Sequence, residues 1–359
     1  MDFDKIFLKD ACPTTIGGQA VMEGVAMKGP EKSAIVVRIP DGRLHIKTYK
    51  TQKAKSWQKL PLIRGVVAFV RSLTEGIGTL TYSADVLEYY GKWQEDSRFN
   101  EKLSVKEDGA ATEVASSTDA INGTESISDK EDGEKGNSNV KDQILTFGAV
   151  ALAILVSIFL FAMVPTMAAA LFKKFTTNHI VLNVIEGLIR LGLFVLYIWA
   201  TSLIDDVKRT YQYHGAEHRA IHCFENNLPL TTTNASGFLT LHPRCGTSFL
   251  MFVMLISLVL FSFMGWPSLW VRFVSRVALI PVIAALSYEL LRWAGKSDNW
   301  FIKIMSVPGL CLQKITTVDP DPQQQEVAIV SLKAVLDSES PYIEGICDSS
   351  CNLIQEVKI

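Results

Sequence analysis

Four of the chain's six histidines fall between residues 214 and 242. His214 and His218 are four residues apart, so on a helix their imidazoles differ by about 40° and can bind one metal ion. The order His-x-x-Glu-His is the one found in inverzincin metalloproteases, in which the glutamate is the general base. We therefore predict a divalent metal site, with zinc as the ion, His214 and His218 as ligands and Glu217 as the catalytic base.

A second cluster of metal-binding residue types follows, just before a long apolar stretch. His242 and Cys245 supply nitrogen and sulfur donors of the kinds that zinc accepts. The link between the clusters is short and amphipathic, so it can fold them back toward His214. Glu225 ranks below the histidines as a ligand, because it lies about 16 Å from His214 along a helix axis and can reach the same ion only if the helix breaks. The two asparagines that follow Glu225 offer such a break.

A structural explanation fits the same residues. His214, Glu217 and His218 can form a charged helix face at a membrane surface. Cys245 can be a small buried side chain at the point where a helix enters lipid. At this stage the metal site is a hypothesis, with structural histidines as its alternative.

The rest of the chain is apolar enough to place these clusters beside a lipid bilayer. Of its 359 residues, 48% are hydrophobic, and a bilayer-spanning helix needs roughly 20 consecutive apolar residues. The spans we expect are residues 143–172, 180–204, 245–271 and 273–293, the last of them interrupted by Pro281. The predicted fold class is mainly α: a multi-pass helical membrane protein with about four transmembrane helices and a small N-terminal region that contains a β-hairpin.

Basic residues orient these spans. The four basic residues of segment 205–244, which carries the histidines, outnumber Lys173 and Lys174 in the loop on the opposite side. Under the positive-inside rule this polar loop faces the cytoplasm or its organellar equivalent.

Shorter elements are expected ahead of the spans. Residues 33–39 and 43–49 are β-branched runs joined by Pro-Asp-Gly, which predicts a hairpin. Residues 57–90 are apolar apart from a narrow helical stripe of polar side chains, which suits a membrane surface or a packed helix bundle. The stripe consists of Arg64, Arg71, Glu75 and Tyr82.

The remaining segments complete the expected organisation. Residues 94–142 hold 13 acidic and 6 basic residues but one aromatic, too little apolar surface to order a chain, so we expect a disordered linker. Pro308-Gly309 predicts a turn, and the spacing of 325–336 predicts a helix. The expected regions are the hairpin and amphipathic helix (1–93), the acidic linker (94–142), two spans (143–204), the histidine-rich loop (205–246), two further spans (247–293), a C-terminal segment (294–338) and a tail (339–359).

Several classes of protein are excluded. The chain has no basic tract interleaved with aromatics, so nucleic acid is not an expected partner. Gly295-Lys296-Ser297 lacks the earlier glycine that a P-loop needs. Cys347 and Cys351 have no second pair to complete a zinc site, and they are expected to be ordinary thiols in a reducing compartment.

Four motifs in order, GGQAVMEG, YHGAEH, HPRCGTSF and PGLCLQKITT, resemble the YqhQ-like membrane protein family, known as domain of unknown function 1385. The resemblance runs from about Ile16 to Leu336 and implies a metal-dependent enzyme, without naming a substrate. The polar positions of the family correspond in this chain to Gln19, Glu23, His214, Glu217, His218, Glu225, His242, Arg244 and Cys245. The acidic insert and the cysteine-bearing tail depart from the compact bacterial pattern and indicate a plastid member in a chloroplast membrane. A bacterial chain would lie in the plasma membrane.

Three functions remain open from the sequence. The first is an integral membrane metalloprotein acting as a metal-dependent hydrolase, with His214 and His218 joined by His242 or Cys245, and with Glu225 as the lower-ranked ligand. The second is a non-enzymatic assembly or scaffold factor, whose polar loop binds protein partners of unknown identity. The third is a transporter, suggested by Glu186 and Arg190 inside the second span.

Overall fold

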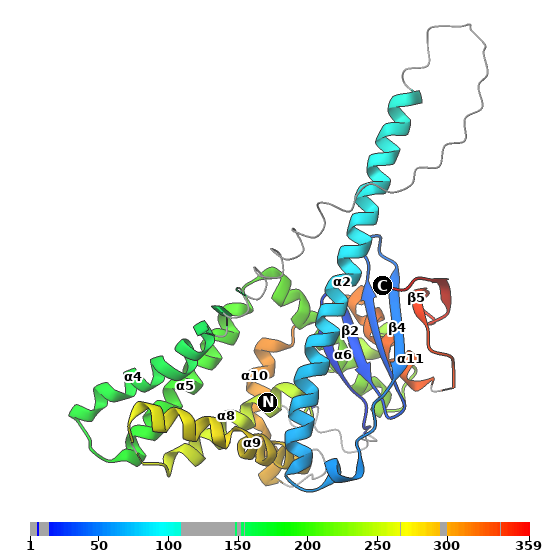
Figure 1. Cartoon of the computed structure of the whole chain (residues 1–359). Coiled ribbons are helices and arrows are strands. Elements are labelled where there is room, and N and C mark those ends of the chain that lie inside the picture. Colours follow the sequence, from blue (N-terminus) through cyan, green and yellow to red (C-terminus); the bar gives the residue numbers. More distant parts are fainter. Residues whose placement is uncertain are drawn as a thin grey trace, which may run out of the picture.

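The computed structural model describes residues 6, 14–108, 148, 152–153, 155–265, 267–294, 300–337 and 339–359. Within these ranges a β-sheet covered by helices lies beside a group of apolar helices (Figure 1). The long helix α2 (Ile63–Asp108) passes along the sheet and extends beyond it (Figure 1). The fold is mostly helical, as the sequence predicts.

The sheet has six strands, each antiparallel to the next in chain order. The strands are β1 (Gly17–Val21), β2 (Gly24–Lys28), β3 (Lys32–Arg38), β4 (Leu44–Lys50), β5 (Glu344–Cys347) and β6 (Leu353–Glu356). The predicted hairpin is confirmed as β3 and β4, whose pairing closes at Arg38 and Leu44. The glycine-rich N-terminal segment forms a second hairpin, β1 and β2. The C-terminal tail adds β5 and β6, two strands that we did not predict.

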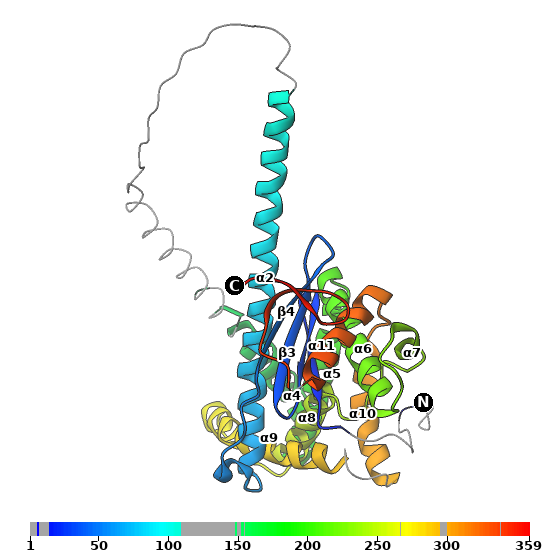
Figure 2. The ribbon, with the colours of Figure 1, turned by 90° about the vertical axis from the view of Figure 1, so that its right-hand side faces the viewer.

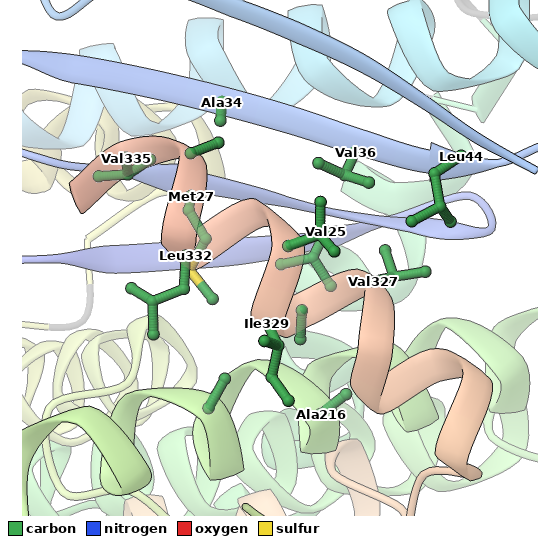
Figure 3. Packing of buried hydrophobic residues seen from close by; sticks show 14 of the residues in the cluster. Val25, Met27, Ala34, Val36, Leu44, Ala216, Val327, Ile329, Leu332 and Val335 are labelled. Atoms are coloured by element: carbon green, nitrogen blue, oxygen red, sulfur yellow. The ribbon is translucent and has the colours of Figure 1, made fainter. Parts of the chain in front are cut away.

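Both faces of the central strands of the sheet are buried. On one face, β2, β3 and β4 pack against α6 (Asp205–Glu225) and α11 (Pro322–Leu336), the helix predicted near residues 325–336. Figure 3 shows side chains of α11 between the strands and Ala216 of α6. The other face packs on α2, and Figure 2 shows the two helical layers on opposite sides of the strands. Neighbouring residues of a strand alternate between these layers, as the strand period of two requires: Val36 faces α11 and Val37 faces α2.

The polar stripe on α2 faces the protein. Arg64 pairs with Glu289, Arg71 donates to the Gln58 side chain, and Glu75 pairs with a lysine of β2. Tyr82 donates to a Glu344 side-chain oxygen at 2.8 Å. Apolar residues of the same helix, among them Leu73 and Ile77, are exposed, so the membrane-surface setting and the packed setting of this amphipathic helix both stay open.

His45 of β4 faces α2, where a hydrophobic residue would be expected. It is fully buried, with its ring nitrogens 2.8 Å from Tyr82 Oη and 3.2 Å from Tyr90 Oη. Burial lowers the pKa of His45 from its usual 6.5 to about 4, although the nearby Glu344 opposes the shift. The neutral imidazole is therefore the form that the folded protein holds.

We predict that His45 makes the fold acid-sensitive. Between pH 6.5 and 4 the unfolded chain binds a proton that the folded chain does not, so stability falls as the pH falls, by about 3 kcal/mol at pH 4. Thermal unfolding in detergent should show this loss for the wild type. His45→Gln keeps a polar partner for the tyrosines and should flatten that part of the profile. Equal pH slopes for the two proteins would contradict the assignment.

The apolar helices agree with a multi-pass membrane protein. Among the described residues, three helical stretches are long and apolar enough to cross a bilayer: Leu155–Lys174, His179–Thr201 and Trp270–Trp293. The first begins with helical residues 155–158 and continues through the π-turn η2 (Phe159–Met163), α4 (Val164–Leu171) and η3 (Phe172–Lys174). The others lie in α5 (His179–Thr201) and α9 (Leu269–Ala294). The fourth apolar helix, α8 (Gly246–Ser262), has 17 residues and is shorter than the span expected there. Pro281 lies inside α9 and does not end the helix. Proline is tolerated in packed membrane helices, where neighbouring groups satisfy the freed backbone.

Two expectations about chain breaks need correction. α2 continues to Asp108, past Gln94, where we expected a disordered linker to begin, and residues 109–142 of that linker lie outside the described residues. Pro308-Gly309 is no turn, because both residues lie within helix α10 (Trp300–Thr316). A Cβ at Gly309 would come within 2.7 Å of Ser248 Oγ, so the glycine allows α10 to pack closely on α8.

The short helices complete the elements. They are η1 (Ser56–Lys59), before α2, and α7 (Thr232–Ser236), between α6 and α8. Cys347 and Cys351, expected to be ordinary thiols, are both free, and Cys347 is buried against the α11 layer.

Candidate metal centre

Helix α6 presents the histidines on one buried face. Asp205 and Asp206 in its first turn favour helix formation by interacting with the helix dipole. The helix ends at Glu225, and Asn227 adopts a positive φ of 55°, so the predicted break after Glu225 is present. Because the helix is unbroken up to Glu225, that carboxylate stays more than two turns away from His214.

The first candidate metal-binding group consists of His214, His218 and Cys245. One donor atom from each lies within 4.8 Å of the others. His214 Nε2 is 3.1 Å from Cys245 Sγ, and the two imidazole centroids are 4.5 Å apart. His218 and Cys245 are buried, whereas His214 is partly exposed. The structure thus brings together both predicted histidines and the predicted cysteine.

The loop that carries Cys245 is held by a buried glutamine of α10. Gln313 accepts a hydrogen bond from His242 N and donates to His242 O, both at 2.8 Å, and it also donates to Ser248 Oγ at 3.0 Å. Cys245 is the N-cap of α8, and its sulfur accepts the Thr247 N–H at 3.4 Å. These contacts fix the thiol at the start of an apolar helix.

Backbone carbonyls set the tautomers of three histidines. His214 Nδ1 donates to Thr316 O at 2.8 Å, His218 Nδ1 to Thr240 O, and His222 Nε2 to Leu241 O at 2.9 Å. In the neutral form of each ring, the remaining nitrogen then carries a lone pair. A hydrogen bond from the second nitrogen to a carbonyl is typical of histidines that bind metals, because it orients the ring and raises its basicity.

The charges in the first group suit a cation. Burial alone would lower the pKa of His214, but Cys245 and Glu217 raise it to about 9. Burial alone would raise the pKa of the Cys245 thiol, but His214 and His218 hold it well below its usual range. Both shifts favour an imidazolium–thiolate pair of His214 and Cys245, and a metal ion bound there would displace the His214 proton and take the thiolate as a ligand.

Glu217, the predicted general base, lies beside this group and outside its ligand set. The side chain is almost fully buried, and its carboxyl carbon packs so closely on Gly18 of β1 that a Cβ there would come within 2.9 Å. Burial raises the pKa of Glu217, and the neighbouring His218 and His214 oppose the shift. A buried carboxyl group with a raised pKa next to a cation site is suited to proton transfer.

A second candidate group consists of His222, Glu225 and His242. All three side chains are buried, and their donor atoms also lie within 4.8 Å of one another. Two of the predicted ligands, Glu225 and His242, are thus placed with His222 and apart from His214. The predicted ligand set lacks His222, although its spacing of four from His218 continues the same helix face. Gln313 was also missed, since it lies far away in the sequence.

The other polar residues that the family resemblance singled out make separate contacts. Glu23 pairs with Arg209 and accepts a hydrogen bond from Tyr213 Oη at 3.2 Å. Gln19 Nε2 donates to Gly76 O of α2 at 3.2 Å. Arg244 pairs with Glu225. Neither Gln19 nor Glu23 belongs to a metal-binding group of the described residues.

Together, the apolar helices and the buried histidine groups define a helical membrane protein with a candidate metal centre. The family model described as a protein of unknown function, DUF1385, matches residues 60–338. The protein described as uncharacterized protein YqhQ, from Bacillus subtilis (strain 168), is 32% identical over 336 residues, which cover 92% of this chain and 95% of that one. The chain belongs to the DUF1385 family, as its motifs suggest. No solved structure matches it.

Proposed function

We propose that the protein is a metal-dependent hydrolase of the membrane surface, with a divalent ion held by His214, His218 and Cys245. The observation that carries this proposal is the convergence of two imidazole rings, each oriented by a backbone carbonyl, with the sulfur of Cys245. Two nitrogens and one sulfur are donors that zinc prefers among the common ions. His214 is the partly exposed member of the group, so we place the substrate on its side.

The donor count supports a catalytic use of the site. Structural zinc sites have four protein ligands, whereas catalytic sites have three and keep one position open. An ion there supplies Lewis-acid activation of a carbonyl or phosphoryl group and of water. Glu217 would take and return the proton, since its carboxyl group is held against Gly18 beside the same histidines.

The membrane location supports a substrate that reaches the bilayer surface. Cys245 caps α8 and Thr316 ends α10, so the ends of two apolar helices contribute to the site. We further propose a chloroplast membrane as the location. The acidic insert and the cysteine-bearing tail, which depart from the compact bacterial pattern, support this assignment, and chloroplast fractionation tests it.

Elemental analysis of detergent-purified protein tests the metal site. We expect His214→Ala to lose the ion of the first group, because it removes one of three ligands. The matched control is His179→Ala, since His179 is an exposed histidine at the start of α5 and should leave the metal content unchanged.

The opposite result has a clear meaning. If the wild type holds no stoichiometric zinc, iron or manganese, and added metal does not raise its thermal stability, the hydrolase proposal is wrong. The histidines would then be structural, and the scaffold alternative would account for the polar loop.

A further inference from the structure

The second group of histidines and carboxylate forms a site of its own. His222, Glu225 and His242 are each at least 95% buried, and their donor atoms lie within 4.8 Å of one another. We propose that this group binds a second divalent metal ion, separate from the ion of the first group. The inference needs only these residues, so it does not depend on the proposed hydrolase activity.

Two buried ring nitrogens face the space where an ion would bind. Among the described residues, His222 Nδ1 and His242 Nε2 have no hydrogen-bond partner, although both side chains are almost fully buried. His222 Nε2 already donates to Leu241 O, so Nδ1 holds a lone pair. Buried polar atoms in folded proteins are normally satisfied, and a cation between the two rings would satisfy both.

The carboxylate of Glu225 is oriented toward this space. Its Oε1 pairs with Arg244 and accepts the Thr14 N–H at 2.9 Å, whereas Oε2 lies 3.5 Å from His242 Nε2. That distance is too long for a good hydrogen bond, yet it fits two ligands of one ion. Binding at Nε2 moves the ring proton of His242 to Nδ1 and gives up only a long 3.3 Å contact with Arg244 N.

One ion cannot serve both groups. His214 and His222 are eight residues apart, about 12 Å along the helix axis. Ligand bonds of about 2.0 to 2.3 Å allow two donor atoms of one zinc ion to be at most about 4.6 Å apart. The imidazole centroids are 4.5 Å apart for His214 and His218 and 4.6 Å apart for His222 and His242, whereas those of His218 and His242 are 5.5 Å apart, so the rings form two pairs.

The second ion would connect α6 to the loop that carries Cys245. His222 and Glu225 come from the last turns of the helix, and His242 comes from the loop three residues before the thiol. With two nitrogens and one carboxylate oxygen, the group suits zinc, iron or manganese. Because all three ligands are buried, we assign this ion a role in positioning the loop.

Metal stoichiometry of the full chain in detergent tests the proposal. We expect two ions per wild-type chain and one in Glu225→Gln. The matched control is Arg244→Gln, which breaks the same ion pair without removing a ligand and should keep two ions. If Glu225→Gln does not fold, His222→Gln gives the same readout while leaving the Glu225–Arg244 pair intact.

Cobalt substitution tells the two sites apart, since only the first contains a thiolate. Glu225→Gln should keep the thiolate-to-cobalt charge-transfer absorption and lose one equivalent of cobalt. A single ion in the wild type that Glu225→Gln retains would overturn the second site and leave the proposed function standing. An ion that is lost in Glu225→Gln and retained in His214→Ala would support the second site and contradict the proposed function.

Discussion

Glu217→Gln is expected to keep the metal content of the protein and to lower its hydrolytic rate by about 10²- to 10⁴-fold. The amide has the volume of the carboxylate, so it can occupy the same buried place against Gly18. The ligands of the first group stay in position because Glu217 is not one of them. An amide, however, cannot accept a proton. The measurement is hydrolysis of an activated para-nitrophenyl ester and the corresponding phosphate, with metal content determined on the same samples.

The control for this variant is His218→Ala, which removes a ligand. It should lower the metal content itself, and added ion should restore little of the activity. A purely structural role for Glu217 predicts another pattern, in which Glu217→Gln lowers thermal stability and leaves the pH profile unchanged. Activity that stays within threefold of the wild type in a metal-loaded Glu217→Gln protein would exclude Glu217 as the base.

The first candidate metal-binding group could largely be predicted because it depends on local geometry. His214 and His218 are neighbours on any α-helix, so their spacing alone places both rings on one face. Cys245 could be proposed from its donor type and the length of the link. The division into two groups could not be predicted, since it depends on how residues 240–245 return to α6. That path is set by Gln313 of α10, which holds His242 through two hydrogen bonds.

In the fold, too, the elements set by neighbouring residues could be predicted, and those set by distant contacts could not. The hairpin of β3 and β4 follows from β-branched runs and a turn signal that are adjacent in the sequence. Strands β5 and β6 lie almost 300 residues further along. β5 pairs with β4 and β6 pairs with β5, through backbone hydrogen bonds that leave little trace in composition. Pro308-Gly309 predicted a turn, because this dipeptide is typical of turns. The sequence alone does not reveal that Gly309 instead allows a close contact between two helices.

The buried charges between the membrane helices form a cluster that holds α4, α5 and α9 together. Glu186 of α5 is fully buried and accepts hydrogen bonds from Thr166 Oγ1 and Arg190, both at 2.8 Å. Arg276 of α9 donates to both of its oxygens, and Arg272 Nη1 lies 3.5 Å away. The sequence suggested the pairing of Glu186 with Arg190, four residues apart, and the structure adds the partners from the neighbouring helices.

Glu186→Gln is therefore expected to destabilise the protein by about 3 to 5 kcal/mol, because it leaves buried guanidinium groups without their carboxylate. The comparison is Glu289→Gln, whose pair with Arg64 is about a quarter exposed and should contribute less than about 1 kcal/mol. Thermal unfolding in detergent measures both. Adding Arg276→Met to Glu186→Gln should recover part of the loss, since it removes one of the uncompensated charges.

This experiment also addresses the transporter alternative, which rests on the same charged residues. A carboxylate that translocates ions must exchange partners, whereas one that joins helices must keep them. A large loss of stability in Glu186→Gln with recovery by Arg276→Met would assign the cluster to helix packing. If Glu186→Gln were no less stable than Glu289→Gln, the carboxylate would not be needed for packing, and the assignment of the cluster to helix packing would be wrong.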